Sequence, residues 1–160
     1  MVGSNPIGPT MKAILFDFSR TLLFPKDKNY LGGLNDLNKQ LSANPGYNAL
    51  DHFEINLELL EIAKNTNKDL YMFTSESIQE RPEFAQYLTV FKKIYSAKLL
   101  GLSKKDSATY IQIAKDIGLA PNELTYIDDN GDNIQAAKEA GLLIVQYLNN
   151  QQAREMLTSL

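Results

Sequence analysis

The sequence contains no cysteine and no tryptophan, and its one histidine is His52. Disulfide bonds and thiolate metal sites are therefore excluded, and so is any metal site that needs several histidines. Neither sign of charge dominates, because 16 lysines and arginines stand against 19 aspartates and glutamates, with a net charge of −3. This balance gives no electrostatic reason to expect nucleic acid or an anionic membrane as a partner.

Long apolar runs are missing as well. No run approaches the ~20 residues that a membrane-spanning helix needs, so we expect no membrane segment. Residues 1–10, MVGSNPIGPT, lack the basic end and apolar centre of a signal peptide. We interpret them as a flexible leader or a cloning remnant and expect a cytoplasmic protein. The remaining residues, 11–160, are enough for a single domain with a real core.

What the sequence does contain is an alternation of short apolar runs and amphipathic segments. This alternation is typical of βαβ units and therefore predicts an α/β fold with a parallel sheet. The runs that are apolar on both faces, as buried parallel strands are, cover residues 12–18, 69–74, 92–97, 124–128 and 142–148.

Helix signals lie between these runs. Asp51 and Glu54 form a capping pair that predicts a helix start, and Asp106 or Ser107 predicts another, which Gly118 would end. The apolar stripe expected in that second helix is Tyr110, Ile111, Ala114 and Ile117. Further predicted helices cover residues 35–41, 133–140 and 149–159. Residues 24–50 are irregular and too short for a separate cap domain, so we predict a short flap or loop there.

Polar side chains stand where the predicted strands end. Asp17 ends the first strand, Thr74 and Ser75 the second, and Asp128 with Asp129 the fourth, while Lys104 lies in a loop. Ligands of open parallel sheets bind beyond the carboxyl ends of the strands. Carboxylates at that edge can bind Mg²⁺, and the lysine and hydroxyl groups can hold a phosphate.

Four segments carry a family resemblance in their order and spacing: AILFDFSRT (13–21), YMFTS (71–75), KKDSATY (104–110) and YIDDNGDNIQAAKEAG (126–141). Together they resemble the motifs of the haloacid dehalogenase superfamily of hydrolases. The resemblance implies a three-layer α/β/α Rossmann-like fold. Because Asp17 and the acid after the fourth strand would have to reach one ion, we predict the strand order 5-4-1-2-3, numbered along the chain.

The resemblance also implies roles for single residues. Asp17 would be the nucleophile that forms an aspartyl-phosphate, and Mg²⁺ would be held by Asp17, the backbone carbonyl of Ser19 and Asp129. The phosphate-binding groups would be the hydroxyl of Thr74, the backbone N–H of Ser75 and the amine of Lys104. The supporting residues behind these ligands would be Asp128, which supports a metal-bound water or orients Lys104, together with Asn133 and Thr21.

The sequence departs from the family pattern at two positions. Ser19 stands where the phosphatases of the family carry the carboxylate that protonates the leaving oxygen and then activates water. A serine hydroxyl cannot do this, and such general acid–base help is typically worth about 10²–10⁴ in rate. Arg20 stands where a small residue is usual.

Several functions are compatible with this pattern. The first is a capless Mg²⁺-dependent phosphatase, weakened by Ser19 and open enough for a macromolecular phosphorylated substrate. The second is a catalytically inactive relative that binds phosphate or a protein. Carbon–halogen hydrolysis ranks lower, since the enzymes concerned rely on a large helical cap that residues 24–50 cannot supply. A receiver domain fits less well, because receivers place their acidic pair after the first strand.

Overall fold

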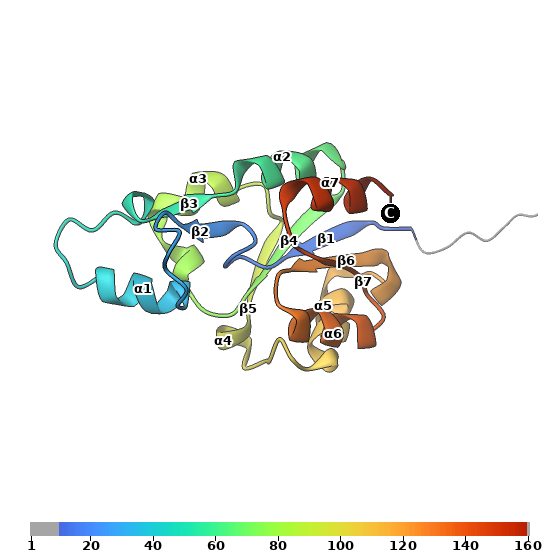
Figure 1. Ribbon diagram of the computed structural model, residues 1–160. Helices are drawn as coiled ribbons and strands as arrows, with labels where there is room; N and C mark the ends of the chain where they lie inside the picture. Colours follow the sequence, from blue (N-terminus) through green and yellow to red (C-terminus); the bar gives the residue numbers. More distant parts are fainter. Residues whose placement is uncertain (1–9, 160) are drawn as a thin grey trace, which may run out of the picture.

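The computed structural model describes residues 10–159, which form a five-stranded parallel sheet covered by helices on both faces (Figure 1). The strand order is β5-β4-β1-β6-β7. In that order the bounds are Lys93–Ser96, Asp69–Thr74, Ala13–Phe16, Leu124–Asp128 and Leu143–Gln146. Both the parallel sheet and the predicted order are confirmed, since the five strands numbered along the chain give 5-4-1-2-3 when read from the opposite edge.

Strand β1 shows why the domain has three layers. Its side chains alternate between the faces of the sheet, so that Ile14 and Phe16 belong to one buried cluster and Ala13 and Leu15 to the other. The helices on the first face are α2 (Leu57–Asn65), α3 (Ala85–Leu88) and α7 (Asn150–Ser159). Those on the second are α4 (Ala97–Leu100), α5 (Ser107–Ile117) and α6 (Gly131–Glu139).

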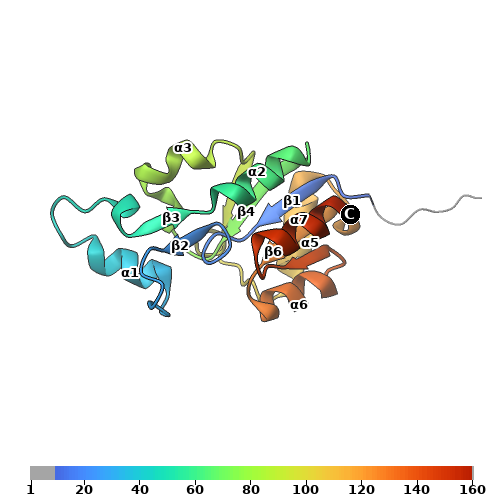
Figure 2. The same ribbon diagram turned by 45° about the horizontal axis from the view of Figure 1, so that its top comes forward.

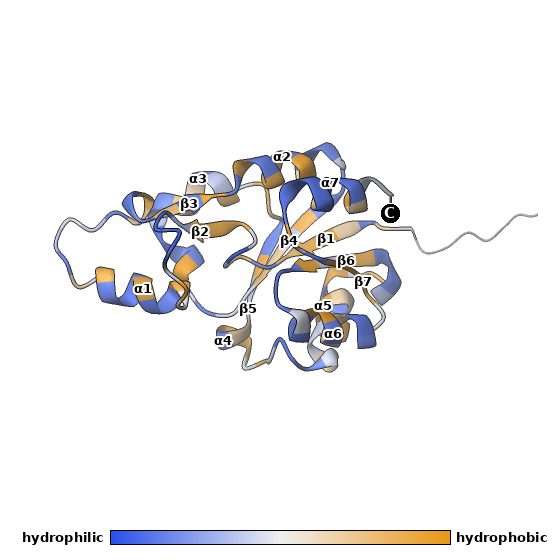
Figure 3. Cartoon of the chain, viewed as in Figure 1, coloured by the Kyte–Doolittle hydropathy of each residue, from blue (hydrophilic) through white to orange (hydrophobic). Residues whose placement is uncertain are grey.

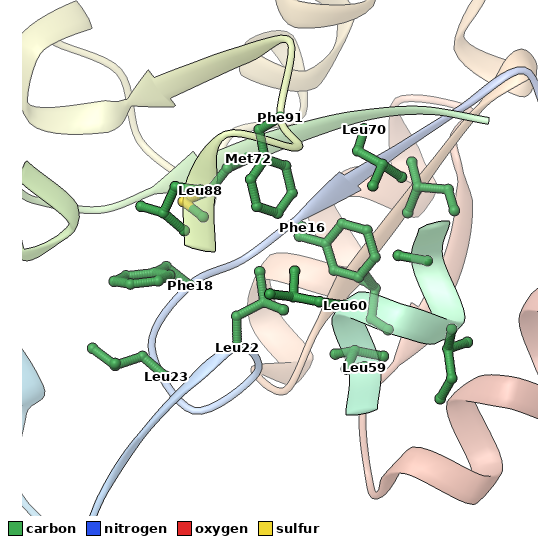
Figure 4. Close-up of a cluster of buried hydrophobic side chains, with 14 of the residues drawn as sticks. Phe16, Phe18, Leu22, Leu23, Leu59, Leu60, Leu70, Met72, Leu88 and Phe91 are labelled. Carbon is green, nitrogen blue, oxygen red and sulfur yellow. The ribbon is translucent and has the colours of Figure 1, made fainter. Parts of the chain in front are cut away.

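Apolar packing fixes the sheet against these helices. Figure 4 shows Phe16, Leu60 and Phe91 side by side, and the rings of Phe16 and Phe91 meet edge to face with centroids 6.1 Å apart. Fully burying one such side chain stabilises a protein by about 1.5–3 kcal/mol. In Figure 3 the strands are largely hydrophobic, whereas the outward helix faces are hydrophilic. The packed core therefore holds the strand ends in fixed positions, as a functional site requires.

The ends of helix α5 match the prediction, but its buried stripe is partly wrong. The Asp106 side chain accepts a hydrogen bond from the N–H of Ala108, and Gly118 ends the helix with φ +90°. Ile111 is 49% exposed, and Ile113 is buried in its place. The physical reason is helical spacing, because Ile113 lies three residues after Tyr110 and so shares its face, whereas Ile111 is turned away by one residue.

The predicted helix start at Asp51 and Glu54 is wrong. Residues Phe53–Ile55 form a short strand, β3, which pairs antiparallel with β2 (Leu23–Pro25), and Asp51 ends a 3₁₀ turn before it. The alternation of buried and more exposed side chains along β3 is a strand pattern. A capping motif at this site was misleading, because the strand's partner lies about thirty residues upstream and leaves no local signal.

Helix α2 starts later than predicted, whereas the other predicted helices lie close to their expected bounds. Asn56 caps α2, where its side chain accepts from the N–H of Leu59. Helix α6 begins two residues before its predicted start, because Asn130 caps it. Helix α7 matches its prediction closely, and so does α1 (Leu34–Leu41), which lies in the segment that joins β2 to β3.

This segment, residues 26–52, is called the insertion below. Figures 1 and 2 show α1 and the β2–β3 pair beyond the carboxyl ends of the central strands, away from the C-terminus. Two hydrogen bonds attach it to the chain after β4: Ile78 N–H donates to Asn35 Oδ1 at 3.2 Å and Ala49 N–H to Glu83 Oε2 at 2.7 Å. The single-domain division and the open site expected from residues 24–50 stay predictions.

Within residues 10–159, no helix has the length and the apolar character needed to cross a membrane. The predicted leader, residues 1–10, lies outside the described residues except for Thr10.

Candidate active site

Two neighbouring strands bring three carboxylates together. Phe16 and Ile127 are paired in register, and the N–H of Asp17 donates to the carbonyl of Ile127 at 2.9 Å. Asp17 therefore lies beside the end of β6, and the carboxylates of Asp17, Asp128 and Asp129 each offer an oxygen within 4.8 Å of the others. Asp17 and Asp129 thus lie close enough to reach one ion, as the argument for the strand order requires.

Asp17 is buried and forms an ion pair with Lys104. The Nζ of Lys104 lies 2.5 Å from one carboxylate oxygen of Asp17, and the hydroxyl of Thr21 donates to the other at 3.4 Å. Lys104 is itself buried, with Nζ 5.0 Å from the ring centre of Phe73 and 3.9 Å from Asp128. The neighbouring Lys105 is exposed, so Lys104 is the lysine that the fold brings to the acids.

Asp128 is fully buried, and neighbouring residues donate hydrogen bonds to its carboxylate. It accepts hydrogen bonds from the hydroxyl of Tyr126 at 2.5 Å, the N–H of Asn130 at 2.9 Å and the side-chain amide of Asn133 at 3.0 Å. Asn133 thus lies behind the acids, as its predicted supporting role requires. Asp128 is held in one orientation, and its position 3.9 Å from Lys104 suits a group that orients the lysine.

Two tyrosines of the site were missed in the sequence. Tyr126 stands two residues before Asp128, on the same face of β6, and the alternation of strand side chains was the signal that could have found it. The hydroxyl of Tyr110 donates to the carbonyl of Lys104 at 2.6 Å, which fixes the loop that carries the lysine. Burial, assisted by the charge of Asp128, raises the pKa of Tyr126 well above its ordinary value, so the tyrosine stays a neutral donor.

The grouping of acids perturbs their ionisation. Burial raises the pKa of Asp17 to about 8, with Asp128 adding to the rise and Lys104 opposing it. Burial and the neighbouring Asp128 raise the pKa of Asp129 to about 6. A bound cation would favour the ionised form of both groups. Clustered carboxylate oxygens are the ligands that Mg²⁺ prefers, so the residues at this edge fit that ion.

The end of β4 contributes Thr74 and Ser75 to the same edge. Thr74 is buried next to the β1 strand end, and its hydroxyl donates to the side chain of Gln79 at 3.4 Å. Gln79, a buried residue that the sequence reasoning missed, is held in turn by the carbonyl of Glu76. Ser75 is exposed at the start of the following loop. Thr74 ends the strand beside β1 and Ser75 follows it, at the edge where the phosphate-binding role was predicted.

Ser19 lies in a tight loop directly after β1. The carbonyl of Phe18 accepts the N–H groups of Leu22 and Leu23, both at 2.9 Å, and so closes the loop around Ser19. Ser19 is only partly exposed. The loop therefore holds Ser19 close to Asp17 without bringing a further carboxylate from β1 to the site.

Comparison with known proteins identifies the family. The sequence model of the haloacid dehalogenase-like hydrolases matches residues 48–141. An enolase-phosphatase E1 from Aquifex aeolicus is 30% identical over 100 residues, which are 59% of this chain and 44% of that protein. The chain thus spans less than half the length of this relative.

Solved structures agree on the fold. A haloacid dehalogenase superfamily hydrolase from Geobacter sulfurreducens has a TM-score of 0.67 at 13% identity, covering 98% of this chain and all of the other. A family enzyme from Bacteroides thetaiotaomicron, solved with magnesium and inorganic phosphate, has a TM-score of 0.59 at 13% identity, covering 86% of this chain and 94% of the other. By its matched motif region and its fold, the chain belongs to the haloacid dehalogenase-like hydrolases.

Proposed function

We propose that the protein is a Mg²⁺-dependent phosphatase that acts through an aspartyl-phosphate on Asp17. The observation that carries the proposal is the environment of Asp17, whose buried carboxylate lies 2.5 Å from Lys104 and within 4.8 Å of oxygens of Asp128 and Asp129. An enolase-phosphatase among the relatives and a fold neighbour solved with magnesium and phosphate support the same chemistry.

In the first half-reaction a carboxylate oxygen of Asp17 attacks phosphorus, and the bond from phosphorus to the leaving oxygen breaks. Lys104, the Thr74 hydroxyl and the Ser75 N–H bind the oxygens of the transferred phosphoryl group. Held by Asp17, the Ser19 carbonyl and Asp129, Mg²⁺ would supply the positive charge that offsets the charge of the phosphate. Asp128 keeps Lys104 in place.

In the second half-reaction water attacks phosphorus, which releases inorganic phosphate and regenerates the Asp17 carboxylate. Ser19 supplies no carboxylate to take the proton of that water or to protonate the leaving oxygen beforehand. The protein therefore prefers substrates with good leaving groups, such as acyl and aryl phosphates, and hydrolysis of the aspartyl-phosphate limits its turnover. The insertion carries one helix of 8 residues at the strand ends, which leaves room for a large phosphorylated substrate, including a macromolecule.

The decisive experiment is turnover of aryl phosphates, acetyl phosphate and a panel of phosphorylated metabolites, each with Mg²⁺ and with EDTA. We expect Mg²⁺-dependent release of phosphate, fastest with acetyl and aryl phosphates. Calorimetric titration should detect Mg²⁺ binding that is lost in Asp129→Ala while the circular dichroism spectrum stays unchanged. Unaltered Mg²⁺ affinity in that variant would contradict the ligand assignment.

The second candidate is a catalytically inactive member that binds phosphate or a protein, and the absence of an acid at Ser19 is the observation that favours it. Beryllofluoride separates the two candidates, because it mimics a phosphoryl group on an aspartate. The phosphatase should bind beryllofluoride at Asp17 in the presence of Mg²⁺. Absence of both turnover and beryllofluoride binding would support the binding module.

A further inference from the structure

Arg20 adopts a backbone conformation that is unusual for its residue type. Its φ is +60°, and within residues 10–159 the other non-glycine residue with positive φ is Asn67, at +58°. Glycine adopts this region freely, whereas an arginine there is strained. The N–H of Arg20 donates to the carbonyl of Leu23 at 2.7 Å, so the loop imposes the conformation. A strained backbone three residues after Asp17 calls for a functional reason.

The guanidinium of Arg20 binds the insertion. Its Nη2 donates to the carbonyl of Tyr30 at 3.1 Å and to that of Gly32 at 2.7 Å. Hydrogen bonds from a charged donor such as this are stronger than those between neutral groups. Arg20 therefore ties the loop of the nucleophile to a point in the chain ten to twelve residues further on.

The turn that Arg20 holds is itself well formed. The hydroxyl of Tyr30 donates to the carbonyl of Gly33 at 2.9 Å, and a Cβ on Gly32 would lie 2.5 Å from that hydroxyl, so a larger residue there would displace the Tyr30 side chain. Leu31 lies between the two carbonyls that Arg20 binds, and it is 86% exposed. The turn thus presents a large apolar side chain to solvent on a fixed backbone, in a segment anchored beside the site.

We propose that Arg20 is a positioning residue that holds the Tyr30–Gly33 turn beside the nucleophile loop, where the turn contacts the part of the substrate beyond the phosphate. The inference rests on the proposed phosphatase function. Asn35 and Ala49 attach the insertion to the chain after β4, and Arg20 attaches it to a second part of the chain, the loop after β1. With both in place the insertion keeps one position relative to the phosphate site, and binding a substrate requires no further ordering of the turn.

Hydrogen exchange of the variant Arg20→Gly tests the tether. Glycine accepts the left-handed backbone, and the substitution removes the whole side chain with its guanidinium. We expect amide exchange in residues 27–34 to rise about 10-fold or more, as loss of hydrogen bonds from a charged donor implies, with no change in the central strands. The control is Asn67→Gly, which relieves the same backbone conformation. Asn67 lies just before β4, at the end of that strand away from the candidate site. Equal exchange of residues 27–34 in wild type and Arg20→Gly would overturn the tether.

Kinetics test the contact with substrate. Arg20→Gly should raise KM for aryl phosphates and larger phosphorylated metabolites. The factor should be about 5 to 10 times the factor for acetyl phosphate, because that molecule ends close to its phosphate. Arg20→Lys, which keeps a charged donor, should recover part of the difference. An equal change in KM for large and small substrates would overturn the contact. If wild type hydrolyses no phosphate at all, the proposed function and the contact both fail, whereas the exchange result still decides the tether.

Discussion

The two central strands, β1 and β6, end in different ways although they lie side by side. After β6, Asp128 is buried with three donors at 2.5 to 3.0 Å from Tyr126, Asn130 and Asn133. After β1, Asp17 has the Lys104 amine at 2.5 Å and the Thr21 hydroxyl only at 3.4 Å. One carboxylate is saturated with neutral donors, while the other faces a cation and keeps room for a further partner.

This difference agrees with the roles proposed for the two acids, a supporting role for Asp128 and a reacting role for Asp17. A carboxylate whose oxygens already accept hydrogen bonds is held in place and is a poor nucleophile, so Asp128 suits a structural task. Asp17 is the less constrained of the two. The amine of Lys104 beside it can also bind the negative oxygens of a phosphoryl group on Asp17. The same strand end lacks a second acid, because Ser19 occupies its place. The acid after β6 thus has its full set of donors, whereas the end of β1 carries the proposed nucleophile without a second acid.

The largest effect should come from Asp17→Asn. If Asp17 forms the covalent intermediate, the amide cannot attack phosphorus, and activity should fall by on the order of 10⁴–10⁶. The measurement is phosphate release from acetyl phosphate with Mg²⁺. Asp132→Asn, which changes an exposed aspartate in the segment 126–141, is the control for loss of a carboxylate outside the acidic cluster and should keep full activity. Equal activity in both variants would remove the proposed distinction between β1 and β6.

The next effect should come from completing the β1 end with Ser19→Asp. A carboxylate there can protonate the leaving oxygen and then activate water, so kcat/KM for alkyl phosphates should rise by about 10²–10⁴. Aryl phosphates, whose leaving oxygens need little protonation, serve as the internal comparison and should gain less. No gain with either class would mean that the serine is not what limits catalysis.

The contrast between the two strand ends also explains what the sequence could predict. Asp17, Thr74 and Asp128 each follow an apolar run, and parallel strands bring their carboxyl ends to one edge, so the grouping of these side chains followed from local patterns. The strand order also needed the shared ion that the family resemblance implies. Lys104 comes from a loop, yet the spacing of a family motif was enough to place it. These features depend on nearby sequence or on the rules of parallel sheets.

The features that the sequence did not predict depend on distant contacts. Strand β3 pairs with β2 across the whole insertion, and nothing near Phe53 indicates that partner. The hydrogen bonds from Arg20 to Tyr30 and Gly32 require a fixed turn whose shape arises from packing of the Tyr30 ring over Gly32. Gln79 is likewise buried by the way that the segment after β4 folds back. Contacts of this kind join residues far apart in the chain, and no local sequence pattern indicates them.

The ionisation of the two strand ends should appear as a pH dependence of stability. In the folded, metal-free protein the pKa of Asp17 is raised from 3.8 to about 8 and that of Asp129 from 3.8 to about 6. A raised pKa in the folded state means that the folded protein binds the proton more tightly than the unfolded chain does. The stability gained from this proton binding is complete below pH 3.8. It is lost as the pH rises through about 6 for Asp129 and about 8 for Asp17. The free energy of unfolding should therefore fall between pH 5 and 9.

Urea unfolding in EDTA measures this loss. We expect a decrease of about 2–4 kcal/mol between pH 5 and 9, mostly from Asp17, because the Lys104 ion pair offsets only part of the cost of burial. Asp17→Asn should flatten the profile, and added Mg²⁺ should stabilise wild type more at the upper end of this range than at the lower, since the ion binds ionised carboxylates. Stability that is constant or rises over this range would contradict the charge clustering.

The smallest effect should come from loosening the β6 end with Asn133→Ala. The variant removes one of the three donors to Asp128 and leaves the nucleophile, the lysine and Asp129 in place. Because groups behind a metal site typically contribute 10- to 100-fold to affinity or activity, we expect a loss in that range in Mg²⁺ affinity and in kcat. Calorimetric titration measures the Mg²⁺ affinity, and steady-state kinetics measure kcat.

The control is Asn122→Ala, which removes an exposed asparagine that does not touch the acids. If Asn133→Ala behaves like Asn122→Ala, Asp128 does not depend on its neutral donors, and the saturated hydrogen bonding after β6 is a feature of packing and not of function.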